Sequence, residues 1–196
     1  MAQEIEAKYR VEDHAELRRR LREASARPLG RVLETNSFFD TPQGTLRQQD
    51  RGLRIRAAVP IDEQNAAIPG RPARTTITYK GPRLESRWKV RQEIELVVDD
   101  AATAEALLEA LGFVRALSFQ KRRESWRLDD CAVELDELPY LGRFVEIEGP
   151  DASIEGVARR LGLADLPVEK AAYSTLLHEL SRQRGLGAEI AFPVER

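Results

Sequence analysis

The sequence predicts an α+β fold: a closed β-barrel (tunnel) of about eight strands with a charged interior, covered outside by about four helices. Apolar and charged residues alternate at period two in eight segments, which is the pattern of strands with one face on a core. Charges of one sign recur two residues apart along these strands, and four amphipathic segments could cover the apolar faces. No repeat or boundary interrupts the 196 residues, which predicts a single domain over residues 1–196.

The first strand is predicted at QEIEAKYR, where Glu4, Glu6 and Lys8 share one face and apolar residues share the other. Turn signals such as TPQG and LPYLG separate the later segments. Residues 60–73 are rich in Pro, Gly and Ala and lack periodicity, so we expect a mobile loop there. The predicted strands span residues 3–10, 31–41, 52–59, 74–81, 88–98, 113–128, 131–138 and 142–149.

Helices are predicted where apolar residues recur at helical spacing. Residues 12–24 place Leu17 and Leu21 on one face of a charged segment. Residues 99–112 begin with an aspartate cap and end at Gly112. Apolar stripes mark this helix and two C-terminal ones: Leu107, Leu108 and Leu111; Ile154, Val157, Ala158 and Leu161; Tyr173, Leu176, Leu177 and Leu180.

Like charges at positions i and i+2 are the feature that points to function. Such neighbours lie about 6.5–7 Å apart and repel, so repeated pairs require counter-ions. One pair alone fits a solvated strand face, but exposed faces usually mix Thr, Ser, Gln and Lys. Inside a closed barrel, carboxylates would bind a divalent metal and basic groups would bind phosphate, which predicts a polyphosphate tunnel. The pairs are Glu4/Glu6, Glu93/Glu95, Glu134/Asp136, Glu146/Glu148, Arg54/Arg56, Lys89/Arg91 and Lys121/Arg123.

Composition excludes several other classes of protein. Acidic and basic residues nearly cancel, 33 against 31, so the basic excess typical of nucleic-acid binders is absent. One cysteine and two histidines exclude a disulfide framework and disfavour a zinc site, which leaves a hard, oxygen-liganded metal. The early charges do not form a signal peptide and no apolar run reaches membrane-spanning length, so we expect a cytoplasmic protein without membrane contact. A homodimer is a reasonable expectation.

Eight segments along the chain carry a family signature. They are EIEAK (4–8), FFDTPQGTL (38–46), LRIR (53–56), TYKGP (78–82), RQEIE (91–95), KRRE (121–124), VELDELPYLGRFVEIEG (133–149) and EKAAYSTLL (169–177). Together they resemble, in order, the CYTH superfamily of triphosphate tunnel metalloenzymes. That family includes class IV adenylate cyclases, thiamine triphosphatases and inorganic triphosphatases. The resemblance covers nearly the whole chain and implies an eight-stranded antiparallel barrel.

The resemblance also implies roles for individual residues. The metal-site acids would be Glu4, Glu6, Glu146 and Glu148, assisted by Asp136, with Glu93, Glu95 and Glu134 as second-rank candidates. The phosphate cradle would comprise Lys8, Arg54, Arg56, Lys80, Lys121 and Arg123, and Lys170 would reach the tunnel from near the last helix. Glu4, Glu6 and Lys8 would be the catalytic residues.

These residues predict hydrolysis of a small triphosphate compound: inorganic tripolyphosphate, thiamine triphosphate or a nucleoside triphosphate. A water activated by Mg²⁺ or Mn²⁺ would attack the terminal phosphorus. The alternative is a class IV-type adenylate cyclase, which needs a pocket for the base. Trp88 or Trp126 could stack on such a group, although both fit the packed outer face better. A non-catalytic polyphosphate-binding module and a salt-bridged sheet without a site are the remaining alternatives.

Overall fold

A single sheet accounts for all strands in the computed structural model, which describes residues 2–193. The strand bounds agree closely with the predicted segments. They are β1 Ala2–Val11, β2 Arg27–Asp40, β3 Gly52–Pro60, β4 Arg74–Leu84, β5 Lys89–Val98, β6 Val114–Leu128, β7 Cys131–Leu138, β8 Gly142–Glu148 and β9 Glu189–Ile190.

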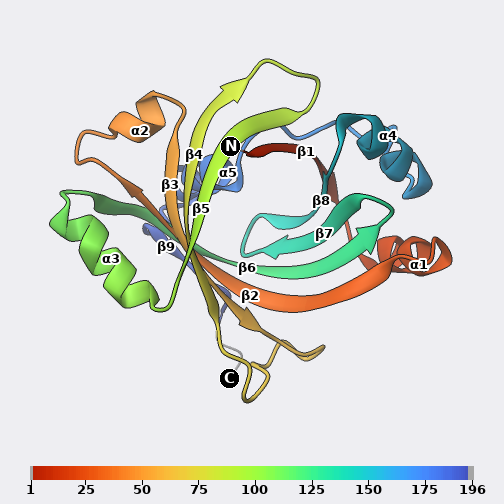
Figure 1. The fold of residues 1–196 in the computed structure, drawn as a ribbon, viewed down its shortest axis with the longest axis horizontal. Helices are drawn as coiled ribbons and strands as arrows, with labels where there is room; N and C mark the ends of the chain where they lie inside the picture. Colours follow the sequence, from red (N-terminus) through yellow and green to blue (C-terminus); the bar gives the residue numbers. More distant parts are fainter. Residues whose placement is uncertain (1, 194–196) are drawn as a thin grey trace.

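Eight of the strands found within residues 2–193 close into an antiparallel barrel. Their order is β2-β3-β4-β5-β1-β8-β7-β6, and β2 pairs with β6 to complete the ring (Figure 1). The short β9 adds to β6 in parallel outside this ring. The predicted closed barrel is therefore confirmed. In the ring β1 lies four strands from β2 in either direction, so these two strands face each other across the interior.

The helices of the same region are α1 Ala15–Glu23, α2 Thr45–Gln48, α3 Ala101–Ala110, α4 Asp151–Arg160 and α5 Tyr173–Arg184. Four of them match the predicted segments. α2 was not predicted, because its four residues follow the turn signal TPQG and form no apolar stripe. None of the helices in the described part of the chain is long and apolar enough to cross a membrane.

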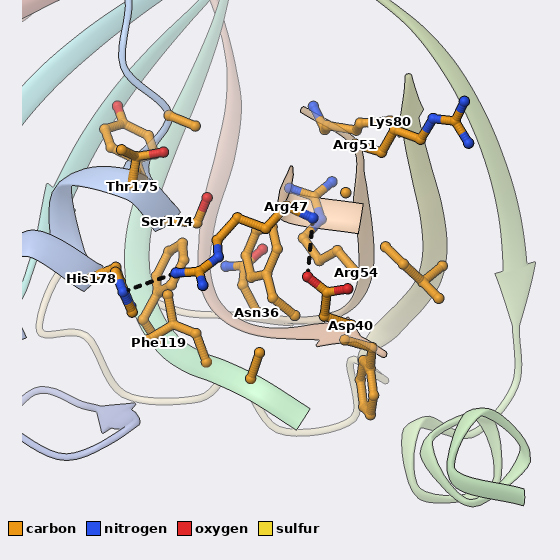
Figure 2. Close-up of a pocket in the computed structure, with 18 of the residues that line it drawn as sticks. Asn36, Asp40, Arg47, Arg51, Arg54, Lys80, Phe119, Ser174, Thr175 and His178 are labelled. Carbon is orange, nitrogen blue, oxygen red and sulfur yellow. Dashed lines mark hydrogen bonds between the residues drawn. The ribbon is translucent and has the colours of Figure 1, made fainter. Parts of the chain in front are cut away.

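α2 and α5 meet at one end of the barrel. The Arg47 Nη1 of α2 lies 3.1 Å from the His178 Nε2 of α5, as Figure 2 shows. The carboxylate of Asp40, at the end of β2, accepts hydrogen bonds from the backbone N–H groups of Leu46 and Arg47 and so fixes α2. Tyr173, the first residue of α5, is buried and stacks edge-on against Phe144 of β8. α5 therefore closes part of this end.

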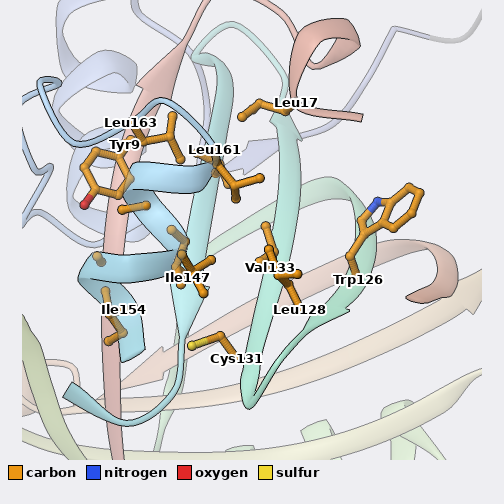
Figure 3. Packing of buried hydrophobic residues seen from close by; sticks show 14 of the residues in the cluster. Tyr9, Leu17, Trp126, Leu128, Cys131, Val133, Ile147, Ile154, Leu161 and Leu163 are labelled. Atoms are coloured by element: carbon orange, nitrogen blue, oxygen red, sulfur yellow. The ribbon is translucent and has the colours of Figure 1, made fainter. Parts of the chain in front are cut away.

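The largest apolar cluster lies outside the barrel, under α1 and α4 (Figure 3). Leu17, Ile154 and Leu161 of these helices pack against outward-facing strand residues such as Val133 and Ile147. Burial of this face stabilises the barrel wall at roughly 25 cal/mol per Å² of apolar surface. Because the apolar side of the strands points outward, the charged side must point inward.

Trp88 and Trp126 belong to the outer cluster and are 4 % and 5 % exposed, which confirms that they are packing residues. The predicted stripe on α3 was only partly correct. Leu108 is buried with Ala104 against β3, but Leu107 and Leu111 are exposed.

The segment between β3 and β4 contains a hydrogen-bonded turn. Asp62 Oδ1 accepts from the N–H groups of Gln64 and Ala66, and Ile61 is buried. Arg31 of β2 donates to the Asp62 and Glu63 carbonyls and to Asn65. The predicted loop is therefore present, and contacts distant in sequence hold it against the barrel.

Candidate functional site

The barrel encloses a cavity of about 870 Å³ that is lined by all eight barrel strands and by α2 and α5. Figure 2 shows Arg54, Lys80 and Asn36 converging on it from different strands. Of the fifteen residues predicted for the site, thirteen line this cavity: Glu4, Glu6, Lys8, Arg54, Arg56, Lys80, Glu93, Glu95, Lys121, Arg123, Glu134, Glu146 and Glu148.

Two predicted site residues lie elsewhere. Asp136 is completely buried behind the lining residues, and both of its oxygens accept hydrogen bonds from bases. Lys170 is exposed and does not line the cavity. The chain near Lys170 runs along β1, where the Glu169 N–H donates to the Lys8 carbonyl, so its position is set by backbone pairing. The structure therefore does not bring Lys170 to the tunnel.

The basic wall comprises Arg54 and Arg56 of β3 and Lys121 and Arg123 of β6, the two strands that flank β2. Arg54 is 8 % exposed and forms no ion pair within the described residues. Its Nη2 donates to Thr78 at 3.2 Å, whereas its buried Nε has no partner. Burial and the adjacent Arg56 lower the pKa of Arg54 to about 10. A buried cation without an ion-pair partner is costly, so Arg54 is a candidate site for binding an anion.

Buried carboxylates hold the other three bases. Glu34 of β2 lies 3.3 Å from both the Arg56 guanidinium and the Lys121 ammonium. Burial opposes ionisation of Glu34, but Lys121 and Arg56 together lower its pKa well below the usual value. Arg123 donates two hydrogen bonds of 2.7 Å to Asp136. Such bidentate pairs fix the direction of the guanidinium as well as its charge.

The acidic wall comprises Glu4 and Glu6 of β1, Glu93 of β5 and Glu148 of β8, three strands that are adjacent in the ring. Burial and the nearby Glu4 raise the pKa of Glu93 to about 7. Burial and the charges of Glu4 and Glu6 raise the pKa of Glu148 to about 7. Centred on β1, this wall faces the basic wall, which is centred on β2. Charges of opposite sign thus face each other across one enclosed space.

Three lysines lie among these acids. The Lys80 ammonium is 3.0 Å from Glu4 Oε2 and is also in ion contact with Glu93. Lys89 lies 2.7 Å from Glu6. The three are Lys8, Lys80 and Lys89.

Lys8 is only 1 % exposed and makes several close contacts. Its ammonium donates to the Ala171 carbonyl at 2.7 Å and lies 4.1 Å from the centre of the Tyr173 ring. The Lys8 Nζ also lies 3.6 Å from Glu146 Oε1. Burial lowers the pKa of Lys8, while Glu146 partly opposes that effect.

The acidic wall has the hard oxygen donors that Mg²⁺ and Mn²⁺ prefer. Burial and mutual repulsion raise the pKa values of Glu93 and Glu148, and a divalent cation would relieve that repulsion. Among the described residues, however, no three such side chains converge closely enough to hold a metal ion. Lys80 and Lys89 lie between the carboxylates. The donor chemistry of this wall therefore suits Mg²⁺ or Mn²⁺, but its side chains as placed here do not form a metal site.

The structure adds site residues that were not predicted from the sequence. Glu34 lies on a strand face shared with Asn36 and Phe38, so no like-charge pair marked it. Lys89 lay in a recognised basic pair but had no assigned role. Arg47 and His178 come from two helices far apart in sequence, and only the fold shows that they meet.

Comparison with known proteins supports a family assignment. The family model of the CYTH domain matches residues 2–161. The adenylate cyclase of Aeromonas hydrophila is 28% identical over 156 residues, which is 74% of this chain and 73% of that protein. A Methanocaldococcus jannaschii relative, provisionally named for the same activity, is 26% identical over 145 residues, or 74% of this chain and 75% of its own length.

A solved structure has a fold similar to that of this chain. The PH1012 protein of Pyrococcus horikoshii superposes with a TM-score of 0.72 at 29% identity, covering 88% of this chain and 98% of its own. Both the sequence match and the closed barrel with its charged interior therefore lead to one conclusion: the chain belongs to the CYTH domain family.

Proposed function

We propose that the protein hydrolyses a triphosphate compound in its barrel cavity with the help of Mg²⁺ or Mn²⁺. The observation that carries this proposal is Arg54, a buried guanidinium without an ion-pair partner among the described residues, which lies beside three further bases. Triphosphate carries about four negative charges near neutral pH, and arginine forks match the geometry of phosphoryl oxygens. The basic wall therefore fits a triphosphate better than it fits a single carboxylate or phosphate.

The opposing walls suggest how the reaction proceeds. A triphosphate bound to the basic wall would present its phosphorus atoms to Glu4 and Glu6. These carboxylates would orient a water molecule and accept its proton while the water oxygen attacks the terminal phosphorus. The bond from phosphorus to the bridging oxygen breaks, and orthophosphate and a diphosphate are released. A metal held near the acidic wall would supply charge neutralisation and a lowered pKa for its water.

Adenylate cyclisation is the second candidate function. Two relatives of this chain carry adenylate cyclase names, and they are 28% and 26% identical to it. The same basic wall would then bind ATP, and the ribose 3′-hydroxyl would attack the α-phosphorus and expel pyrophosphate. Hydrolysis remains the first choice because it requires only water opposite the bound phosphates, whereas cyclisation also requires a fixed ribose.

One assay distinguishes the two reactions. The protein is incubated with tripolyphosphate, thiamine triphosphate or ATP, with Mg²⁺ or Mn²⁺, and orthophosphate, pyrophosphate and cyclic AMP are measured. We expect orthophosphate without cyclic AMP. Formation of cyclic AMP together with pyrophosphate would show that the protein is an adenylate cyclase and not a hydrolase. Tight binding without any product would show that it is a non-catalytic binding module.

A matched pair of variants tests the role of the acidic wall. Glu4→Gln removes a charge that faces the phosphates, so we expect kcat for hydrolysis to fall by about 100-fold or more. Glu109→Gln makes the same change at an exposed position of α3 and should have no effect. Near wild-type turnover by Glu4→Gln at saturating metal would contradict the proposed role of the acidic wall.

A further inference from the structure

Arg91 of β5 lines the cavity, but its guanidinium is bound to the protein itself. The residue is 8 % exposed. Its Nη1 donates to the Asp50 and Gly81 carbonyls, each at 2.7 Å, and its Nη2 donates to Asp50 Oδ1 at 2.7 Å. Both terminal nitrogens are therefore engaged by the chain. Arg91 belongs to a basic pair with Lys89 in the sequence, and neither the family resemblance nor the proposed reaction gives it a role.

Asp50 has the conformation and charge that this contact requires. It lies between α2 and β3 with φ of +52°, in the left-handed region that aspartate tolerates better than most residues. Its Oδ2 accepts hydrogen bonds from the backbone N–H and the Nε of Arg83, at 2.8 and 3.1 Å. Burial opposes ionisation of Asp50, but hydrogen bonds from Arg83 and Arg91 lower its pKa below the usual value. A charged Asp50 thus joins arginines of β4 and β5.

The contacts of Arg91 lie beside an irregularity in the β4–β5 ladder. Lys80 pairs with Glu93, whereas the next pair joins Arg83 to Arg91, so β4 contains an extra residue at this point. Gly81, whose carbonyl accepts from Arg91, is the first residue of this bulge.

Arg91 also reaches the end of the ladder on the other side of Lys80. Lys80 pairs there with Gly52, the first residue of β3, and this is the last pair of the β3–β4 ladder. Arg91 binds Asp50 just before Gly52 and Gly81 just after Lys80. One side chain therefore holds both strands at the pair that contains Lys80.

This ladder end determines where the Lys80 ammonium lies. It is 3.0 Å from Glu4 Oε2 and also contacts Glu93 inside the cavity. Bulges redirect side chains near functional sites, and the ends of ladders open more easily than their centres. A side chain on a mobile backbone loses more conformational entropy when it binds a ligand, which weakens binding. The hydrogen bonds of Arg91 oppose that mobility before any ligand arrives.

We propose that Arg91 is a positioning residue, which fixes the Gly52–Lys80 end of the β3–β4 ladder so that Lys80 is in place for a triphosphate. This inference rests on the proposed function for its ligand. A charged residue that lines the cavity could instead bind phosphate directly. The two roles make opposite demands, because a phosphate ligand needs a free guanidinium, whereas a positioning residue needs one bound to Asp50 and Gly81.

Arg91→Lys separates the positive charge from the hydrogen bonds. Lysine keeps the charge in the cavity but lacks the planar fork that reaches Asp50 and Gly81 together. Arg18→Lys is the matched control, since Arg18 of α1 lies 2.9 Å from Glu124 and does not line the cavity. Titration calorimetry with tripolyphosphate in EDTA should show a rise in Kd of about tenfold in Arg91→Lys, and none in Arg18→Lys. A similar rise in both variants would overturn the assignment.

The same substitution in a Lys80→Gln background shows whether Arg91 acts through Lys80. The side chain to be positioned is then absent, so Arg91→Lys should change Kd by less than about twofold. An undiminished loss in that background would show that Arg91 binds the anion itself, and would overturn the proposal.

Asp50→Asn tests the contact from its other partner and gives an answer if Arg91→Lys does not fold. The change removes a negative charge from the cavity lining and weakens the hold on Arg91. Tripolyphosphate should then bind more tightly if Arg91 is a phosphate ligand, and more weakly if it is a positioning residue. We expect weaker binding, and a fall in Kd would contradict the inference.

Hydrogen exchange without any ligand separates this inference from the proposed function. We expect amides around Gly52 and Lys80 to exchange about tenfold faster in Arg91→Lys than in the wild type, while those of β8 keep their protection. Unchanged exchange would overturn the positioning role. If exchange and affinity both change as expected but no triphosphate is hydrolysed, the positioning role stands and the proposed reaction fails. A wild-type protein that does not bind tripolyphosphate would overturn both.

Discussion

Glu34 is the residue on which the basic wall depends most. It is 2 % exposed and lies between Lys121 and Arg56, so its charge is needed to bury two cations together. Removing one partner from a buried ionic group typically costs about 3–5 kcal/mol, because the other charges remain uncompensated. We therefore expect Glu34→Gln to lower the free energy of unfolding by about 3 kcal/mol at pH 7, as measured by urea denaturation.

The same residue predicts a pH dependence of stability. Burial alone would raise the pKa of Glu34, but the surrounding cations hold it well below the unfolded value near 4.3. The unfolded chain therefore binds a proton at Glu34 before the folded chain does, and the stabilisation present above pH 4.3 is lost as pH falls. The stability difference between wild type and Glu34→Gln should be constant from pH 6 to 8 and shrink below pH 4. A difference that does not change with pH would show that packing, and not charge, is responsible.

Most predicted site residues belong to pairs of like charge that alternate along a strand. Glu93 and Lys121 were found in this way, because period two decides which face of a strand a side chain occupies. Asp136 follows the same alternation, but hydrogen bonds from Lys121 and Arg123 hold it behind the residues that line the cavity. Sequence spacing shows which face of a strand a side chain occupies, but it does not show which other side chain it contacts. Lys170 was assigned from the family resemblance of the segment before the last helix, and backbone pairing of that segment with β1 leaves it exposed.

At the scale of elements, α5 is the helix that joins a second apolar cluster to the cavity. Leu177 is fully buried with Phe119 and Ile190, while Tyr173 donates a hydrogen bond of 3.0 Å to Asp136 behind the basic wall. Packing of this one helix thus supports Phe119 of β6 and the basic wall together.

This placement leads to a prediction about α5. Leu177→Ala leaves a cavity beside Phe119, so we expect a loss of about 2–5 kcal/mol in the free energy of unfolding. Leu107→Ala changes an exposed leucine of α3 and should alter it by no more than about 0.5 kcal/mol. Native-state hydrogen exchange should show faster opening of α5 in Leu177→Ala than of β1 or β8. Equal protection of all three elements would mean that α5 unfolds only with the whole barrel.

Elements with strong periodicity were predicted well, and those built by tertiary contacts were not. β7 was predicted from residue 131 to 138 and has the same bounds in the structure. β2 begins at Arg27, four residues earlier than expected, because an irregular pairing with β6 around Pro28 and Gly30 lets the strand continue. α2 depends on the Asp40 carboxylate, and this contact leaves no periodic signal.

The whole molecule has a formal net charge of −2, yet its charges are unevenly distributed. Cations are concentrated at the basic wall, and Arg54 there has no ion-pair partner among the described residues. An anion that binds only the folded state raises stability by mass action, by about 2.7 kcal/mol at one hundred times its dissociation constant.

We therefore expect tripolyphosphate to raise the melting temperature in the presence of EDTA, where no divalent metal contributes. Differential scanning calorimetry over a range of tripolyphosphate concentrations measures this effect. Arg54→Ala should lose most of the shift, whereas Arg127→Ala, at an exposed position of β6, should keep it. An equal shift in both variants would show that the anion binds outside the cavity.

The ladder between β2 and β6 also bears on how the chain folds. These strands are separated in sequence by α2, β3, β4, β5 and α3, so a long loop must close before the ladder gains any contact. Glu34 and Lys121 lie on opposite sides of this seam, and their charges stay hydrated until it forms. Refolding should accordingly be slow for a chain of this size, with zipping of the seam as the late step.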